Sequence, residues 1–189
     1  MIRIAIIGDI GSGKSFVAKN FGYPVFNADN EVSYLYRCDK KIFNKLKKIL
    51  PKYFKTFPID KKKISQAIFD NKNNLKKITN IVHKHVRKRL SLFLSKNSKK
   101  KIVILDIPLL LENKLNYKKD FLVFVDSKKK DILIRLRKRK NFNFKMHKVL
   151  KSKQFSTSYK KKKSHFIIKN DFTKKSIKKE INKILKEIL

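Results

Sequence analysis

The clearest chemical signature in the sequence is a phosphate-binding loop. Residues 8–15 read Gly-Asp-Ile-Gly-Ser-Gly-Lys-Ser, which fits the pattern G-x-x-x-x-G-K-[ST]. Backbone N–H groups of such a loop point at phosphate oxygens, and the helix that follows adds the positive end of its dipole. We expect Lys14 to reach the β and γ phosphates of a nucleotide and the Ser15 hydroxyl to contact Mg²⁺. The alternative is a glycine-rich turn without a ligand, but three of the chain's four glycines lie in this segment.

Two aspartates follow apolar runs that read as strands. Asp29 comes after residues 23–26, and Asp106 ends the run Ile-Val-Ile-Leu-Asp at 102–106. Ligands of parallel sheets collect beyond the carboxyl ends of the strands. Asp29 is therefore expected to accept a proton from a hydroxyl nucleophile, or to orient that hydroxyl. The alternative is a helix N-cap, because aspartate is a favoured cap. Asp106 has the position of the second acid associated with Mg²⁺ in a P-loop enzyme.

Two arginines and two histidines are further candidates for chemistry. Arg135 and Arg139 are spaced i,i+4 on a predicted helix, so both can lean toward one ligand and stabilise a transferring phosphoryl group. The alternative is a solvated pair in a basic chain. His83 and His85 are two residues apart, point to different helix faces and make a poor metal chelate.

The elements that must position these residues follow an α/β order. The sequence predicts parallel strands near residues 4–7, 23–26, 102–106, 120–126 and 164–171. It predicts a helix after the phosphate loop, stopped by Gly22, and a helical stretch over about 39–94 in which Asp60 caps one helix. Further helices are expected over about 128–140 and 146–154, and in a final segment with isoleucines on one stripe. The helical stretch between strands is expected to form a second-substrate pocket or a lid.

Composition narrows the setting without naming a partner. The 189 residues carry a net charge of +37 from 51 Lys+Arg and 14 Asp+Glu. Because the basic residues are spread along the whole chain, including the runs 61–63 and 160–163, we expect a solvated basic surface and no nucleic-acid partner beyond non-specific charge attraction. One cysteine and the lack of any run of 18 apolar residues predict a cytoplasmic protein without a membrane span.

Taken together, the motifs resemble those of the dephospho-CoA kinase family over nearly the whole chain. The phosphate loop is shared with many P-loop proteins, whereas Asp106-Ile107-Pro108-Leu109-Leu110-Leu111-Glu112 is very close to the family's D-[IV]-P-L-L-F-E. The other matching positions are Asn27-Ala28-Asp29, Asp60 with Ile64 and Phe69, His83, Arg135 and Arg139, Gln154, and Asn170 after a late strand.

This resemblance implies a reaction and a fold. The reaction is transfer of phosphate from ATP, with Mg²⁺, to the ribose 3′-hydroxyl of dephospho-CoA, the last step of coenzyme A synthesis. The fold is a three-layer P-loop NTPase core with a parallel five-stranded sheet. A single domain over 1–189 would comprise a core of about 1–35 and 100–189, a helical CoA-binding insertion of about 36–98 and a lid of about 138–160. A monomer or weak homo-oligomer is expected.

The resemblance also implies a role for each matching residue. Asp29 receives or orients the 3′-hydroxyl, Lys14, Arg139 and Arg135 stabilise the transferring charge, and Ser15 and Asp106 hold the metal. The expected nucleotide-binding residues are Gly8, Ile10, Gly11, Ser12, Gly13, Lys14, Ser15, Phe16 and Asn170. The expected substrate-binding residues are Asp29, His83, Pro108 and Leu109.

A few positions depart from the family pattern. Asp9 stands where the family usually has glycine; we expect its side chain to point outward, with charge repulsion that lowers ATP affinity. Phe16 replaces a threonine, and Asn27 replaces the first aspartate of a D-A-D triplet. The sequence leaves three rival functions open: another small-molecule P-loop kinase for nucleosides or nucleoside monophosphates, a nucleic-acid-binding P-loop NTPase, and an inactive kinase.

Overall fold

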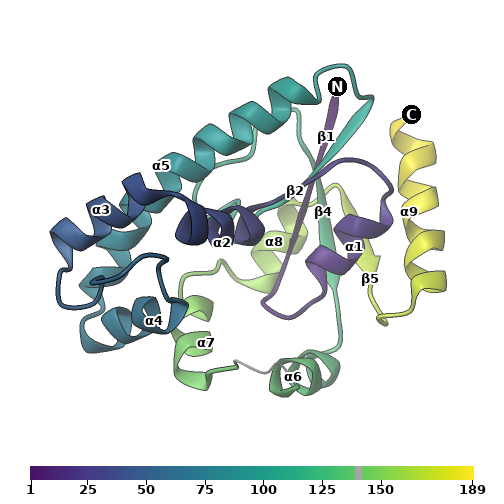
Figure 1. Ribbon diagram of the computed structural model, residues 1–189. Coiled ribbons are helices and arrows are strands. Elements are labelled where there is room, and N and C mark those ends of the chain that lie inside the picture. Colours follow the sequence, from purple (N-terminus) through teal and green to yellow (C-terminus); the bar gives the residue numbers. More distant parts are fainter. Residues whose placement is uncertain (139–141) are drawn as a thin grey trace. The chain divides into compact units, whose positions relative to one another are not determined.

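The computed structural model describes residues 1–138 and 142–189, and its central feature is one parallel sheet. The strands are β1 (Ile2–Gly8), β2 (Val25–Asn27), β3 (Ile102–Asp106), β4 (Phe121–Asp126) and β5 (Phe166–Lys169), in the order β2-β3-β1-β4-β5 (Figure 1). Every neighbouring pair is parallel. This confirms the predicted α/β fold with a parallel five-stranded sheet.

The chain divides into two compact units. The sheet unit comprises Met1–Asn27 and Asn97–Leu189, and the helical unit comprises Ala28–Lys96. Besides the sheet, the first unit contains α1 (Lys14–Asn20), α6 (Lys129–Arg137), α7 (Phe144–Lys151), α8 (Thr157–Lys163) and α9 (Lys174–Ile188). The second contains α2 (Ala28–Cys38), α3 (Lys40–Ile49), α4 (Lys61–Asp70) and α5 (Asn73–Lys96).

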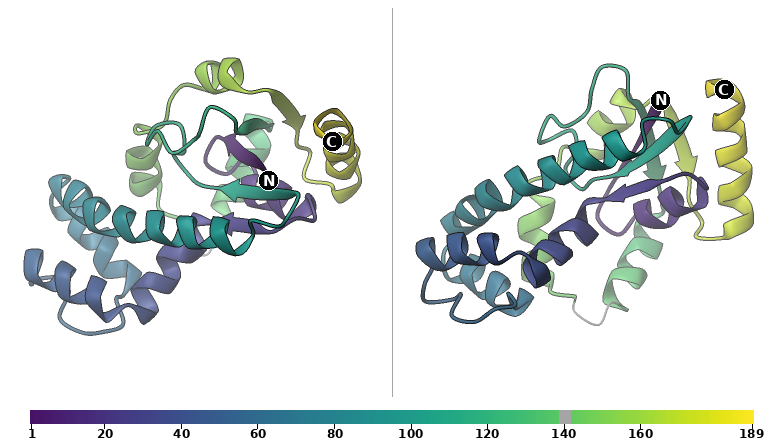
Figure 2. Two further views of the ribbon diagram at one scale, coloured as in Figure 1. Left: turned by 90° about the horizontal axis from the view of Figure 1, so that it is seen from above. Right: turned by 45° about the horizontal axis from the view of Figure 1, so that its top comes forward.

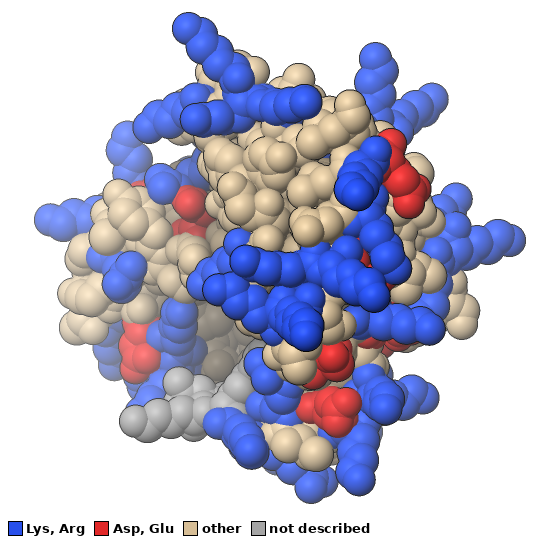
Figure 3. Space-filling view, turned by 90° about the vertical axis from the view of Figure 1, so that its right-hand side faces the viewer, with Lys and Arg blue, Asp and Glu red and all other residues tan. Residues whose placement is uncertain are grey.

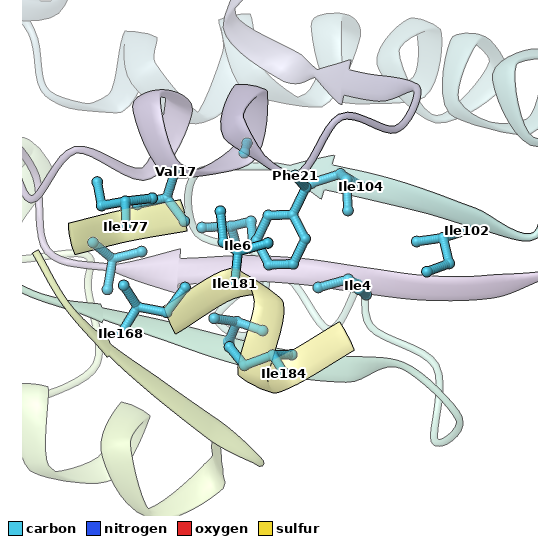
Figure 4. Packing of buried hydrophobic residues seen from close by; sticks show 13 residues of the cluster. Ile4, Ile6, Val17, Phe21, Ile102, Ile104, Ile168, Ile177, Ile181 and Ile184 are labelled. Carbon is cyan, nitrogen blue, oxygen red and sulfur yellow. The ribbon is translucent and has the colours of Figure 1, made fainter. Parts of the chain in front are cut away.

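The core of the sheet unit lies between the sheet and the pair α1 and α9. β3 is buried at every position, as expected of a parallel strand that is covered on both faces. In the close view of Figure 4, Val17 from α1, Phe21 just after it, and Ile177 and Ile181 from α9 meet the isoleucines of the strands. The views in Figure 2 show α9 running beside β5. α8 packs on β1 and β4.

The helical unit is organised by its long helix α5, against which α2, α3 and α4 pack. Asp39 caps α3 by accepting a hydrogen bond from the Ile42 N–H, at 3.1 Å. Asp60 caps α4 in the same way, with the Lys62 N–H at 2.8 Å. The predicted cap at Asp60 is confirmed. Each cap satisfies a helix N–H that would otherwise lack a partner.

The surface carries the charge that the composition requires. In the face shown in Figure 3, Lys and Arg side chains spread over most of the surface, and Asp and Glu are few and scattered. Across residues 1–138 and 142–189, no helix combines the length and the apolar character that crossing a membrane requires.

Truncation of Ile181 tests the core of the sheet unit. Ile181 is 2% exposed, so Ile181→Ala should lower the free energy of unfolding by about 2–5 kcal/mol through lost burial and a cavity. Lys179→Ala on the same helix is the control. Its side chain is exposed, so it should change stability by less than about 0.5 kcal/mol. Denaturant titration followed by circular dichroism measures both; equal effects would contradict this packing.

Candidate functional site

The phosphate loop connects β1 to α1 through backbone conformations that favour glycine. Gly11 and Gly13 have φ of +87° and +89°, a region that costs other residues about 1–2 kcal/mol. Space is limiting as well. A Cβ on Gly13 would lie 2.4 Å from Asn170 Nδ2, and one on Gly8 would lie 2.9 Å from the Val125 carbonyl oxygen. The loop therefore connects a strand to a helix, as predicted. Asn170 and the backbone of Val125 pack closely against it.

Side chains from the C-terminal part of the chain hold the loop in place. The Ser12 carbonyl accepts hydrogen bonds from Asn170 Nδ2 at 2.7 Å and from the Ser127 hydroxyl at 2.8 Å. Asn170 Oδ1 in turn accepts from the Phe172 N–H at 2.8 Å. Asn170 is buried, and both ends of its amide bond to backbone. Its position fits a support of the loop; direct contact with a nucleotide stays a prediction.

The Lys14 side chain contacts the first residues of the phosphate loop. Its ammonium donates to the carbonyl oxygens of Gly8 at 3.2 Å and Asp9 at 2.8 Å. The lysine of a phosphate loop works as a point charge beside the β and γ phosphates. Its position above the loop fits that role.

Asp9 corrects an expectation from the sequence. Its carboxylate is not free in solvent but is hydrogen-bonded to two side chains. Oδ1 accepts a hydrogen bond from Lys160 Nζ at 2.7 Å, and Oδ2 accepts one from the Thr157 hydroxyl at 2.8 Å. Burial by itself would raise the pKa of Asp9, but the bonds from Lys160 and Thr157 and the charges of Lys160 and Lys14 outweigh it and lower that pKa. Asp9 is thus a carboxylate matched by cations, which offsets its repulsion toward a phosphate.

Lys160 corrects a second expectation. The run 160–163 reads as a solvated loop or helix start, yet Lys160 is 2% exposed and is the only lysine buried in the portion of the chain that the structure describes. It lies on α8, which packs against the sheet. A buried ammonium group requires a partner, and Asp9 supplies it.

An asparagine joins the two residues predicted to hold a metal. Asn27 Nδ2 donates to Asp106 Oδ2 at 2.5 Å and lies 3.5 Å from Ser15 Oγ. Asp106 is 2% exposed and pairs in the sheet with Asn27 on β2. The Asn27 amide therefore lies next to both the Asp106 carboxylate and the Ser15 hydroxyl. Carboxylate and hydroxyl oxygens are ligands that suit Mg²⁺.

The segment after β3 lines a small hollow beside the loop. Leu109 has a left-handed φ of +57° and lines this hollow together with Gly8, Lys14 and Lys160. Gln154 and Glu112 also line it. Glu112 Oε1 accepts a hydrogen bond from the Phe155 N–H at 2.8 Å, which ties the chain between α7 and α8 to this segment. Pro108 precedes Leu109 in the same turn.

One of the two predicted arginines can be placed. The Arg135 guanidinium lies 4.1 Å from the centre of the Phe172 ring, a cation–π contact. Phe172 also packs against the loop: its ring atom Cε1 lies 2.9 Å from the position that a Cβ on Gly13 would take. Arg139 falls outside the described residues, so the predicted i,i+4 pair stays a prediction.

Asp29 and His83 belong to the helical unit. Asp29 is the second residue of α2, so it is not the N-cap: the helix already begins at Ala28. The Ser33 hydroxyl donates to the Asp29 carbonyl at 2.7 Å. Burial lowers the pKa of His83, aided by the charge of Arg87, which favours the neutral form of its ring. His85 Nδ1 lies 3.6 Å from Asp39 Oδ2.

Within residues 1–138 and 142–189, no group of three or more His, Cys, Asp or Glu side chains is arranged to hold a metal ion.

Comparison with known proteins decides the family. A sequence profile described as dephospho-CoA kinase matches residues 2–176. The chain belongs to the dephospho-CoA kinase family. A family member named dephospho-CoA kinase from Wolbachia pipientis wMel is 34% identical over 187 residues, covering 96% of this chain and 95% of that protein. This favours the family over the rival P-loop functions left open by the sequence.

Solved structures share the fold. TT1252 from Thermus thermophilus matches with a TM-score of 0.81 and 25% identity, covering 100% of this chain and 98% of the other. Dephospho-CoA kinase from Campylobacter jejuni matches with a TM-score of 0.64 and 24% identity, covering 98% and 96%. The second likeness concerns the fold alone.

Asn27 contacts Ser15 and Asp106, and Lys160 contacts Asp9, although neither is among the site residues that the sequence predicts. The sequence singles out Asn27 within the matching segment Asn27-Ala28-Asp29 and as a departure from the family's aspartate, and its place at the end of a predicted strand is a further usable signal. Lys160 gave no local signal, because it sits in a run of four lysines. Its burial depends on α8 packing against the sheet.

Alanine at Gly13 tests the crowding behind the loop. Gly13→Ala should abolish ATP binding and lower stability, because the added Cβ displaces Asn170 and forces an unfavourable φ. Gly22→Ala is a matched control: Gly22 also has a positive φ, +76°, but an added Cβ there meets nothing within 4 Å. It should cost about 1–2 kcal/mol of stability and leave ATP affinity unchanged. Calorimetric titration measures the ATP affinity of both variants. An equal loss of affinity in the two would show that crowding at Gly13 does not matter.

Proposed function

We infer that this protein transfers the γ-phosphate of ATP to the ribose 3′-hydroxyl of dephospho-CoA, giving coenzyme A and ADP. The observation that carries this inference is the family match over residues 2–176, which spans the phosphate loop and the segment from Asp106 to Glu112. Phosphoryl transfer needs positioning and stabilisation of charge more than covalent help from the protein. The loop and the cations around it are suited to both.

The phosphate side of the site consists of backbone and lysine. We assign the triphosphate to the loop, with Gly8, Ile10, Gly11, Ser12 and Gly13 supplying backbone, and Lys14 supplying charge at the β and γ phosphates. Ser15 and Phe16 lie in the first turn of α1, and Asn170 supports the loop through the Ser12 carbonyl. Arg135 and Arg139 are assigned to the transferring phosphoryl group, where a planar guanidinium suits the spread charge.

The residues present fit a magnesium ion. Ser15 Oγ and Asp106 Oδ2 are both within reach of one Asn27 amide, and hydroxyl and carboxylate oxygens are ligands that Mg²⁺ accepts. Ser15 and Asp106 would hold it. Bound there, Mg²⁺ neutralises phosphate charge. Asn27 orients the Asp106 carboxylate.

The acceptor residues are assigned from the family motifs. Asp29 follows Asn27 by two residues in the chain, and we propose that it accepts the proton of the 3′-hydroxyl or orients that hydroxyl. His83, Pro108 and Leu109 are proposed to contact dephospho-CoA. His83 is suited to donate or accept one hydrogen bond, since its neutral ring has one N–H and one free nitrogen.

The proposed setting is cytoplasmic, as a monomer or weak homo-oligomer. We assign the helical unit to binding of dephospho-CoA, and the segment of about 138–160 to a lid over the phosphates. The high positive charge attracts polyanions non-specifically, an effect that salt should weaken.

Acceptor dependence tests the reaction. With ATP and Mg²⁺, ADP formation should rise strongly on addition of dephospho-CoA and should stay at background with nucleosides, nucleoside monophosphates or RNA. The product should carry one added phosphate, on the 3′ oxygen, measured by mass spectrometry and ³¹P NMR. Turnover with a nucleoside instead would overturn the assigned acceptor.

Replacement of Asp29 tests the proposed base. Asp29→Asn should lower kcat by about 10²- to 10⁴-fold, because the amide cannot accept the proton, while ATP affinity changes little. Asp39→Asn is the control: it makes the same chemical change in the helical unit, where asparagine still caps α3. It should leave kcat near wild type. Steady-state kinetics with dephospho-CoA separates the two, and an unchanged kcat in Asp29→Asn would remove Asp29 from the mechanism.

A further inference from the structure

Asp9 contacts two different lysines through two different groups. Its carbonyl oxygen accepts from Lys14 Nζ at 2.8 Å, and its carboxylate accepts from Lys160 Nζ at 2.7 Å. One residue therefore gathers two ammonium groups at the start of the phosphate loop. Both ammonium groups are positively charged, and the Asp9 carboxylate offsets part of that charge.

Lys160 is placed where a phosphate could use it. It lines the same small hollow as Gly8 and Lys14, and its side chain is 3% exposed. The Lys160 ammonium group has three N–H donors. Within residues 1–138 and 142–189, the hydrogen bond that it donates goes to Asp9. Thr157, from the first turn of the same helix, donates to the other oxygen of Asp9 at 2.8 Å, so the carboxylate has a fixed orientation.

We propose that Lys160 is a second phosphate-binding cation of the nucleotide site and that Asp9 is the residue that positions it. This rests on the proposed function only in requiring that the loop bind ATP. Lys14 serves the β and γ phosphates, and Lys160 shares its hollow and its Asp9 partner, so Lys160 is assigned to the same end of the triphosphate. The Asp9 carboxylate holds the buried ammonium group in place until the phosphates arrive.

A neighbouring ion pair provides a matched control. Lys161, the next residue on α8, pairs with Asp126 at 2.6 Å but does not line the hollow. Lys160→Gln and Lys161→Gln each remove one positive charge from the same helix. Any effect of net charge alone is therefore the same in both variants.

The experiment is calorimetric titration with ATP and with AMP, without dephospho-CoA. Lys160→Gln should bind ATP at least tenfold more weakly, because a charge-assisted bond is lost, and should bind AMP within about twofold of wild type, because AMP lacks the β and γ phosphates. Lys160→Arg should recover most of the ATP affinity, since arginine keeps the charge. Lys161→Gln should match wild type with both nucleotides. ATP affinity within twofold of wild type in Lys160→Gln would overturn the proposal.

The positioning role of Asp9 is tested by a double-mutant cycle. Asp9→Asn should weaken ATP binding about threefold or more in the wild-type background and should have little further effect in Lys160→Gln, because Asp9 acts through Lys160. An equal effect in both backgrounds, or tighter ATP binding in Asp9→Asn, would overturn this part. Thermal unfolding checks that each variant is folded; should Lys160→Gln fail to fold, Lys160→Arg and Asp9→Asn still give the ratio of ATP to AMP affinity. Because no acceptor is present, the result does not depend on dephospho-CoA being the substrate.

Discussion

The hydrogen bonds to the Ser12 carbonyl are the contact on which the rest of the site depends. A phosphate loop must turn its N–H groups inward, which turns some of its carbonyls outward toward the protein. Here Asn170 and Ser127 take up one such carbonyl, and a buried carbonyl left without a partner would cost about 1–3 kcal/mol. Because Asn170 follows β5 and Ser127 follows β4, the shape of the loop at the N-terminus depends on residues from the C-terminal half of the sheet.

The same dependence explains how the chain accommodates an aspartate in the loop. An anion beside a triphosphate is unfavourable by itself. Two donors on α8, Lys160 and Thr157, neutralise and orient the Asp9 carboxylate, and both come from a helix that packs on β1 and β4. The basic residues exposed at the surface therefore differ from the buried Lys160: exposed charges are screened by salt, and a buried pair much less so.

The sequence predicted what local signals encode and missed what depends on distant packing. The five strands, the helix after the loop and the cap at Asp60 follow from apolar runs, glycines and capping residues that stand next to each other in the chain. The strand order, the burial of Lys160 and the contact of Asn27 with Asp106 do not, since each depends on which segment returns beside which. The expectation that Asp9 points outward failed for this reason: its partners lie about 150 positions later in the chain. The roles of Asp29, His83 and Arg139 remain assignments from family motifs.

Asn27 illustrates why a departure from a family motif need not impair a site. An aspartate at this position would put a second carboxylate 2.5 Å from Asp106, where two negative charges repel unless a proton or a cation lies between them. The amide donates a hydrogen bond to Asp106 instead, so the carboxylate is satisfied and oriented before any metal binds. An ordered ligand loses less entropy when it binds a metal, whereas a pair of carboxylates offers the metal more charge. The substitution thus exchanges charge for orientation, and Ser15 and Asp106 keep the oxygen atoms that a magnesium ion would use.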